Sequence, residues 1–446
     1  MKKPYEKPFI TRHHSGIVNK FGEPSVTHVC DTLEGIKVAD LLAQFGSPLF
    51  VYSERKMKEQ YRRLTDAFTL RYPRVQHAWS YKTNYIKAIC KGFHSLGSWA
   101  EVVSEMEYNM ARNLGIAPSR IIFNGPSKPY PILKTALTDG AMVNVDSMDE
   151  LYDVEKIAGE IGAPVTIGIR LNMSLGTYMA WDRFGFSLDS GEAFRTVKRA
   201  VSGEKIQLAG LHAHIGTFIL DPELYRIAIR NMIGFGKLIK EEFGITVKYI
   251  DIGGGFASRN KLKGAYLPTD ETAPSFDRYA EEITDELLSA FKPDELPLLI
   301  LETGRALIDE CAVLISSISA VKRLANGTRA LIIDAGVNLL FTAFWYNHEV
   351  IPTIDRGVAT EDHILYGPLC MQIDVAHPQI KLPYLEKGDA IVIKPVGAYN
   401  NTQWLQFIQL RPRVVMIGEN GVASVIREAE TLDYLQANDR LPDSLA

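Results

Sequence analysis

Residues 76–84 read QHAWSYKTN. The first part of this stretch is short, rich in aromatic residues and bounded by polar ones, which favours a β-strand over a helix. Lys82 and Asn84, two side chains able to do chemistry, follow the strand at once. Strands of a parallel barrel end in this way where they carry functional residues. The stretch therefore predicts the first strand of a larger, repeated architecture.

The same unit recurs over most of the chain, because strand-like segments alternate with helical ones from about residue 48 to residue 308. The expected strands lie near residues 76–81, 98–103, 120–124, 141–146, 164–171, 207–214, 247–252 and 297–302. Helical periodicity is clearest in residues 54–70, and residues 222–243 and 275–291 show it too. The apolar residues of the first helix that fall on one face are Met57, Tyr61, Leu64 and Phe68.

Eight strand–helix units over about 250 residues match a (β/α)8 barrel of the TIM type in size and rhythm. A doubly wound open sheet is the alternative. It is less favoured because no glycine-rich dinucleotide turn follows the first strand. The expected fold is therefore an α/β barrel.

The pattern changes near residue 310, where helical periodicity becomes sparse. Strand-like segments then follow at residues 311–323, 329–334, 389–396 and 413–418. We expect a barrel over residues 48–308 and a mostly β domain over residues 309–446, which residues 1–47 join. A chain of 446 residues also exceeds what one core usually organises.

Composition excludes several classes of protein. The net charge is −4 and no basic tail or stripe is present, which argues against nucleic acid or an anionic membrane as partner. No stretch approaches the ~20 apolar residues of a membrane span, and no apolar region of a secretory signal follows the basic N-terminus. The four cysteines are scattered and form no CxxC pair, which indicates a reducing, cytoplasmic compartment and no metal site.

Reactive residues gather at the expected ends of the barrel strands, the rim where barrel enzymes do their chemistry. The residues at these ends are Lys82, Glu101, Arg170, His212, His214, Gly253–Gly255, Glu302 and Arg305. Each has a structural explanation when taken alone: a surface lysine, hydrogen-bonded core histidines, a close-packing glycine loop, or an ion pair. Cys370, in the β domain, could likewise be a small buried apolar residue. Together the rim residues predict an active site.

Short motifs in a fixed order sharpen this prediction. They are YKTN (81–84), HAHIGT (212–217), IGGGF (252–256), ETGR (302–305), DAGVN (334–338), GPLC (367–370) and GAYN (397–400). The set resembles the barrel-type (fold type III) pyridoxal-phosphate-dependent decarboxylases, which act on diaminopimelate, ornithine and arginine. The resemblance covers nearly the whole chain. It implies a two-domain fold like that of alanine racemase and a decarboxylase that uses pyridoxal 5'-phosphate.

The resemblance also implies a role for each matching residue. Lys82 forms the Schiff base with the cofactor, His214 stacks on its ring, and Glu302 contacts its pyridine nitrogen. The residues implied near the cofactor phosphate are Thr217, Gly253, Gly254, Gly255, Gly304, Arg305 and Tyr399. Cys370 is the implied acid late in the reaction and comes from the partner subunit of a homodimer. Glu107 and Arg170 match supporting positions.

The substrate-binding positions depart from the best-known relatives. The implied positions are Arg305, Tyr346, Met371 and Tyr399. Diaminopimelate decarboxylases carry Glu, and ornithine decarboxylases Asp, where this chain has Met371, and an Arg of the diaminopimelate type is replaced by Thr342. A specialised or carrier-bound amino acid is therefore a plausible substrate, since a buried polar contact can decide specificity. Other residues that could anchor the distal end are Trp345, His348, Asn400 and Gln403.

Two alternatives remain on the same fold. One is an amino-acid racemase, which resembles this chain in the barrel and the lysine but places Arg against the pyridine nitrogen. The other is a non-catalytic homologue that binds pyridoxal phosphate. Glu302 and Cys370 favour decarboxylation over both.

Overall fold

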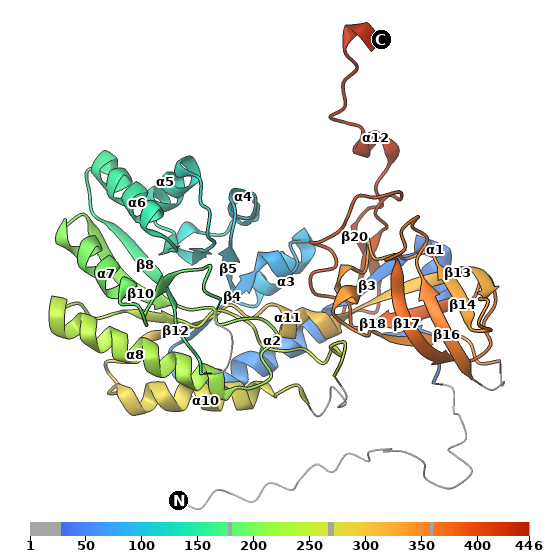
Figure 1. The fold of residues 1–446 in the computed structure, drawn as a ribbon, viewed down its shortest axis with the longest axis horizontal. Coiled ribbons are helices and arrows are strands. Elements are labelled where there is room, and N and C mark those ends of the chain that lie inside the picture. The colour runs from blue at the N-terminus through green and yellow to red at the C-terminus, as the bar shows by residue number, and fades with distance from the viewer. Residues whose placement is uncertain (1–27, 177–180, 266–271, 357–359, 446) are drawn as a thin grey trace, which may run out of the picture.

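The computed structural model describes residues 28–176, 181–265, 272–356 and 360–445. A closed parallel barrel forms one end of the molecule (Figure 1). Its strands are β4 (Val75–Ser80), β5 (Trp99–Val102), β6 (Ile121–Phe123), β7 (Met142–Val145), β8 (Val165–Asn172), β10 (Ile206–His212), β11 (Tyr249–Asp251) and β12 (Leu298–Leu301). The barrel closes where β12 pairs with β4. The eight segments predicted as barrel strands are therefore all confirmed.

Helices surround the barrel on its outside. They are α2 (Glu54–Thr69), α3 (Lys87–Ser95), α4 (Glu105–Asn113), α5 (Tyr130–Asp139), α6 (Met148–Ile161), α7 (Glu192–Ser202), α8 (Glu223–Phe243), α10 (Phe276–Ala290) and the short α11 (Arg305–Ile308). Serine begins several of them: the side chains of Ser53, Ser104 and Ser147 each accept a hydrogen bond from the backbone N–H three residues on. The predicted apolar face of α2 is buried against the core.

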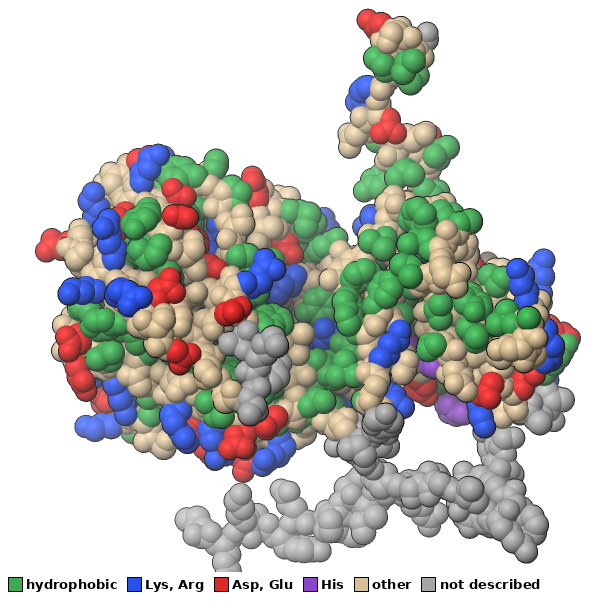
Figure 2. Space-filling model, in the orientation of Figure 1, with side chains coloured by type: hydrophobic (Ala, Val, Ile, Leu, Met, Phe, Trp, Pro, Cys, Tyr) green, Lys and Arg blue, Asp and Glu red, His purple; other side chains and the backbone are tan. Residues whose placement is uncertain are grey.

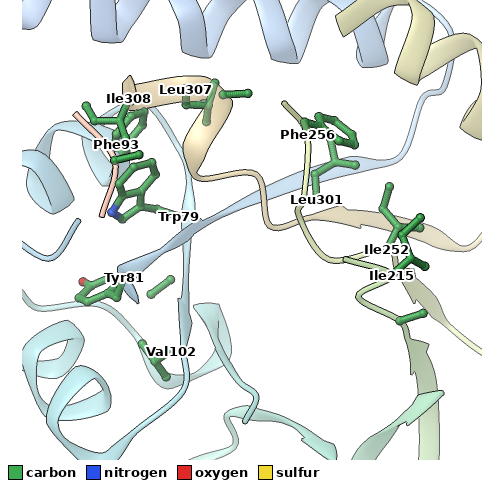
Figure 3. Packing of buried hydrophobic residues seen from close by; sticks show 14 of the residues in the cluster. Trp79, Tyr81, Phe93, Val102, Ile215, Ile252, Phe256, Leu301, Leu307 and Ile308 are labelled. Atoms are coloured by element: carbon green, nitrogen blue, oxygen red, sulfur yellow. The ribbon is translucent and has the colours of Figure 1, made fainter. Parts of the chain in front are cut away.

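Aromatic packing joins the first barrel strand to its neighbours (Figure 3). The ring of Trp79, on β4, stacks on Phe93 of α3 with 3.9 Å between ring centroids. The Trp79 indole N–H donates to the carbonyl oxygen of Asn84, 3.1 Å away. Because both ends of this side chain are satisfied, the strand end that carries Lys82 is held firmly.

One large side chain fills the barrel interior. The side chain of Tyr249 packs beside Gly168 and Gly210; an added Cβ would lie 2.1 Å from its hydroxyl oxygen at Gly168 and 2.3 Å from its ring at Gly210. The remaining neighbours in this small cluster include Ala78 and Ala209. Small residues on these strands therefore make room for a tyrosine that reaches up toward the catalytic rim.

A second, mostly antiparallel sheet forms the other end of the molecule. Its strands are β3 (Leu49–Ser53), β13 (Ala312–Arg323), β14 (Arg329–Ile333), β15 (Glu349–Pro352), β16 (Glu361–Tyr366), β17 (Val375–Leu382), β18 (Ala390–Lys394), β19 (Val414–Ile417) and β20 (Ala423–Arg427). The smaller elements are β1 (Thr32–Leu33), β2 (Ile36–Lys37), α1 (Val38–Phe45) and α12 (Leu432–Leu435), with β9 (Phe186–Ser187) at the barrel edge. The expected β domain after residue 310 is present.

Strand β3 corrects the predicted boundary of the barrel. Residues 48–308 were expected to form it, but β3 pairs with β13 and β19 in the second sheet. All five of its residues are buried, so its sequence LFVYS shows no alternation that would tell one sheet from the other. We therefore propose that the barrel begins with α2. Residues 1–27 of the expected N-terminal segment lie outside the described residues.

Among the described helices, none combines the length and the apolar character that crossing a bilayer requires.

Candidate active site

Lys82 lies just beyond β4, in a single turn of 3-10 helix over Tyr81–Thr83. Its Nζ lies 2.5 Å from Oε2 of Glu101, which lies on β5 and is fully buried. Burial lowers the pKa of Lys82, but the negative charges of Glu101 and Glu302 outweigh burial and raise this pKa above its usual value. The amine is therefore a cation held against a carboxylate, at the edge of an open cavity.

A buried amide joins that carboxylate to a second one. The side-chain nitrogen of Asn124, at the end of β6, donates to Glu101 Oε1 at 3.1 Å and to Glu302 Oε1 at 2.5 Å. Ser80 also donates to Glu101, at 2.6 Å. Glu101 and Glu302 are thus both held by a neutral donor, and Glu101 is also held by Lys82.

Glu302, at the end of β12, has two titratable neighbours. Its Oε2 lies 3.5 Å from His212 Nε2. Burial raises the pKa of Glu302, but His212 and Lys82 lower it overall, whereas burial and the charge of Glu302 raise the pKa of Asp251. Glu302 is therefore the ionised acid of the pair. The ligand atoms of His212, Asp251 and Glu302 lie within 4.8 Å of one another, close enough to hold a metal, so the expectation of no metal stays a prediction.

His214 presents a neutral imidazole to the cavity. Burial, with the positive charges of Lys82 and Arg170, lowers the pKa of His214 well below its usual value. Its Nδ1 accepts a hydrogen bond from the backbone N–H of Gly254, 3.1 Å away. The edge of Trp181 packs against the ring with 5.5 Å between centroids. The ring is therefore fixed in orientation and available to stack on a flat ligand.

The glycine loop after β11 passes too close to its neighbours for any side chain. Gly253 has φ +67°, and an added Cβ would lie 2.6 Å from His214 Nδ1. At Gly255, with φ +98°, the Cβ would lie 2.4 Å from the carbonyl oxygen of Gly216. Only glycine suits these positions. The loop exposes backbone to the cavity, as a phosphate cradle requires.

Arg305 lies across the cavity from this loop, among aromatic rings. Its guanidinium lies 4.5 Å from the ring centre of Tyr399 and 5.4 Å from that of Tyr346, and it donates to the hydroxyl of Thr217 at 3.3 Å. The other terminal nitrogen, Nη1, is buried and has no hydrogen-bond partner among the described residues. A buried guanidinium nitrogen left in this state suits an anionic ligand group.

These groups surround one cavity of about 730 Å³. The predicted site residues that line it are Lys82, His214, Thr217, Gly254, Gly255, Glu302, Gly304, Arg305, Tyr346 and Tyr399. The supporting position Arg170 lines it too, in an ion pair with Asp146 at 3.1 Å. The structure therefore brings eleven residues that the sequence singled out to one cavity.

Three predicted site residues, Gly253, Cys370 and Met371, are not among the described residues that line the cavity. Cys370 is exposed, on the turn between β16 and β17. The carboxylate of Asp374 fixes this turn by accepting the backbone N–H of Leu369 at 2.7 Å.

Thr342 lines the cavity, but its hydroxyl is engaged by residues behind the cavity wall. The Thr342 hydroxyl contacts His348 Nε2 at 2.9 Å and Asn400 Oδ1 at 2.9 Å. Thr342, Trp345 and Gln403 line the cavity, whereas His348 and Asn400 lie buried behind it. Two of the four alternative anchors are therefore placed to meet a ligand.

Sequence reasoning missed several lining residues. Glu101 was noted at a strand end but given no role, and Asn124, Trp181 and Phe184 were not singled out. Asn124 directly follows a strand, so its position alone could have marked it. Trp181 and Phe184 belong to a loop, where spacing gives no such guide.

Comparisons with known proteins agree with this geometry. The family model described as "Pyridoxal-dependent decarboxylase, pyridoxal binding domain" matches residues 54–309. The diaminopimelate decarboxylase of Aquifex aeolicus is 30% identical over 90% of this chain and 94% of its own length. That of Methanocaldococcus jannaschii is 30% identical over 93% and 95%. A crystal structure of a diaminopimelate decarboxylase from M. jannaschii superposes with a TM-score of 0.86 at 28% identity, covering 94% of this chain and 98% of that chain.

The residues of this cavity fit pyridoxal phosphate. An amine meets a carboxylate at one side, a neutral imidazole and a second carboxylate form the walls, and a glycine loop faces a buried guanidinium nitrogen that lacks a partner. This donor set matches an aldehyde, an aromatic ring, a ring nitrogen and a phosphate. The chain belongs to the pyridoxal-dependent decarboxylase family, and it is an amino-acid carboxy-lyase whose cofactor is pyridoxal 5'-phosphate.

Proposed function

We propose that Lys82 binds the cofactor covalently and that the chain releases CO₂ from Cα of an amino acid related to diaminopimelate. The convergence of Lys82, Glu302, His214 and the glycine loop on one cavity carries this proposal. Bound pyridoxal phosphate supplies an electron sink for the pair left at Cα when CO₂ departs. The residues of the chain bind, orient and move protons around that chemistry.

Different residues that line the cavity would bind different parts of the cofactor. The flat, neutral ring of His214 would hold the ring of a bound cofactor by stacking. The Glu302 carboxylate holds a proton at the pyridine nitrogen, because an adjacent negative charge favours the protonated form. The backbone of Gly254 and Gly255 and the hydroxyl of Tyr399 hold the phosphate. A carboxylate at position 302, where the racemase alternative would place Arg, supports decarboxylation.

Glu101 accepts the proton of Lys82. A lysine is nucleophilic only after it loses its proton. The 2.5 Å contact between Lys82 Nζ and Glu101 Oε2 gives that proton an acceptor. With the cofactor bound, the same carboxylate would hold that proton and would be placed to return it to the Lys82 amine.

We propose that a second copy of the chain completes the site with Cys370, which donates a proton to Cα. Cys370 is exposed and lies outside the cavity of its own chain, so it needs another route to a substrate. Hydrophobic side chains gather on the β domain where the C-terminal segment that contains α12 extends away from it (Figure 1 and Figure 2). The exposed apolar residues of the neighbouring loop are Leu405, Phe407, Ile408 and Leu410. A surface of this kind supports a homodimer.

The residues expected to bind the distal end of the substrate differ from those of the best-known relatives. The acids that line the cavity among the described residues are Glu101 and Glu302. Each already has a hydrogen-bond partner: Lys82 for Glu101 and Asn124 for Glu302. Met371 and Thr342 stand where relatives carry charged anchors. We therefore propose a specialised or carrier-bound amino acid as substrate. We also propose a cytoplasmic location, because all four cysteines are free.

Absorption spectroscopy and CO₂ release test this function. Purified protein should show the visible band of lysine-bound cofactor, and Lys82→Ala should abolish it. A screen for CO₂ release should compare diaminopimelate, lysine, ornithine and acylated amino acids. Absence of the band in the wild type, or release of no CO₂ from any of them together with racemisation of one, would overturn the proposal.

A further inference from the structure

A chain of buried hydrogen bonds rises from the barrel interior to the site. The Tyr249 hydroxyl donates to Asn144 Oδ1 at 2.8 Å, and Asn144 Nδ2 donates to Asn124 Oδ1 at 2.9 Å. Asn124 Nδ2 then donates to both Glu101 and Glu302. All five side chains are buried. The chain therefore links the tyrosine in the barrel core to the two carboxylates of the cavity.

The direction of this chain is fixed by chemistry. The Tyr249 hydroxyl at its start can donate or accept, whereas the carboxylates at its end accept only, so the carboxylates set the direction of both amides. If the amide of Asn124 were reversed, its oxygen would face two carboxylates and its nitrogen would face the nitrogen of Asn144. Each amide can therefore satisfy its neighbours in one orientation only.

We propose that Asn124 is a positioning residue for the decarboxylation, because its one amide group holds Glu101 at Lys82 and Glu302 at the pyridine nitrogen. This inference rests on the proposed function of Lys82 and Glu302. An NH₂ group carries two hydrogens, so it can serve both acids at once. Asn144 and Tyr249 act behind it by fixing the direction in which it points.

The Asn124 amide also offsets the repulsion between the carboxylates of Glu101 and Glu302. Two buried carboxylates near each other repel, and one of them tends to take up a proton. In this site both acids must stay ionised, one to accept the Lys82 proton and the other to face the ring nitrogen. A neutral donor between them stabilises both charges without adding a cation that would compete with Lys82.

Two substitutions test Asn124. Asn124→Leu keeps the approximate size and removes the donor; we expect cofactor to remain bound while kcat falls ~10-fold or more and KM changes little, since hydrogen bonds to charged groups are worth about 1.5–3 kcal/mol. Asn124→Asp can donate only while it is protonated. Burial and two adjacent acids raise its pKa, so kcat and the visible band should show an extra loss as the pH rises through about 6–8, far above an ordinary Asp.

A matched control separates positioning from general damage. Asn260 is also buried and also donates to a carboxylate, Asp309 Oδ2, at 3.2 Å, but it does not line the cavity. Asn260→Asp should lower the melting temperature without adding a pH-dependent change to the visible band. The same change at Asn124 should add one.

The results that would overturn the inference are distinct from failure of the proposed function. A wild-type band that is lost in Lys82→Ala establishes the cofactor site by itself. If Asn124→Leu then keeps kcat within twofold, or Asn124→Asp follows the wild-type pH profile, the inference is wrong. Should both variants fail to fold, Tyr249→Phe decides: kcat reduced at least threefold with cofactor bound supports it, and an unchanged kcat refutes it.

Discussion

The backbone N–H of Tyr399 donates a 2.9 Å hydrogen bond to the carbonyl oxygen of Thr83, the residue after Lys82. Tyr399 belongs to the β domain, and Thr83 belongs to the barrel. The hydroxyl of Thr402 makes a second contact of this kind, with the carbonyl oxygen of Lys82 at 2.9 Å. The turn that carries Lys82, the amine that we propose binds the cofactor, is therefore held by contacts from both domains.

Removal of one of these contacts should slow catalysis. Thr402→Val keeps the shape of the side chain and removes the hydroxyl that holds Lys82. We expect a stability loss of about 1 kcal/mol and a several-fold lower kcat, because the turn gains freedom. Thermal unfolding and steady-state kinetics measure the two effects. Thr135→Val, which removes an exposed hydroxyl hydrogen-bonded within α5, should leave kcat unchanged; an equal kcat for both variants would contradict the role of Thr402.

Glu107 should make stability depend on pH. Burial and the negative charge of Glu101 raise the pKa of Glu107 to about 7, whereas an unfolded glutamate titrates near 4.3. A raised pKa of the folded state contributes stability that is complete below about pH 4 and is lost as the pH rises through 7.

The isosteric variant Glu107→Gln should remove this dependence. Between pH 5 and pH 8 the wild type should lose about 2 kcal/mol more than the variant, as measured by denaturant unfolding. The amide oxygen of glutamine can still accept the N–H of Val103, which Glu107 now accepts at 2.8 Å. Glu105→Gln, on the exposed side of α4, should leave the pH dependence as it is. Parallel curves for the wild type and Glu107→Gln would disprove the prediction.

The glycines around Tyr249 should not tolerate a methyl group. In Gly168→Ala the new Cβ would lie 2.1 Å from the Tyr249 oxygen and 2.2 Å from Asn144 Oδ1, which are positions that real Cβ atoms do not occupy. We expect a loss of about 1–3 kcal/mol or more, because an overpacked core must shift its side chains. Gly234→Ala, in α8 with open space around it, should instead gain about 1 kcal/mol. Chemical denaturation of both variants tests this prediction. An unchanged free energy of unfolding in Gly168→Ala would contradict it, because it would show that side chains of the barrel interior can shift to accept a methyl group.

The barrel was predictable because its strands and helices have different periods, and because reactive residues follow the strands directly. Lys82, His214 and Glu302 were found in this way, and the structure brings them to one cavity. Residues 49–53, which form β3, were included in the barrel because a strand buried on both faces has no alternation to show which sheet it joins.

The roles of the polar residues Glu101 and Asn124 could not be predicted from their spacing in the sequence. Glu101 and Asn124 become meaningful only when Lys82 and Glu302 are placed beside them, since the contacts join residues from four different strands. The chain order of those strands says nothing of side-chain direction. An isolated Asn after a strand is also compatible with an ordinary turn.

Mixed dimers should show whether two chains share one active site. Lys82→Ala removes the amine of the barrel, and Cys370→Ala removes the thiol that we assign to the partner, so each variant alone should be impaired. When the two chains exchange freely, half of the dimers are hybrids, and each hybrid has one site with both native groups. Activity should then rise toward about a quarter of that of the wild type, as two-fold symmetry requires. A mixture of Lys82→Ala with Glu302→Ala is the control, because both residues lie in the barrel and no hybrid site is intact. Equal activity in the two mixtures would show that Cys370 acts within its own chain, and full activity of Cys370→Ala alone would show that it has no role.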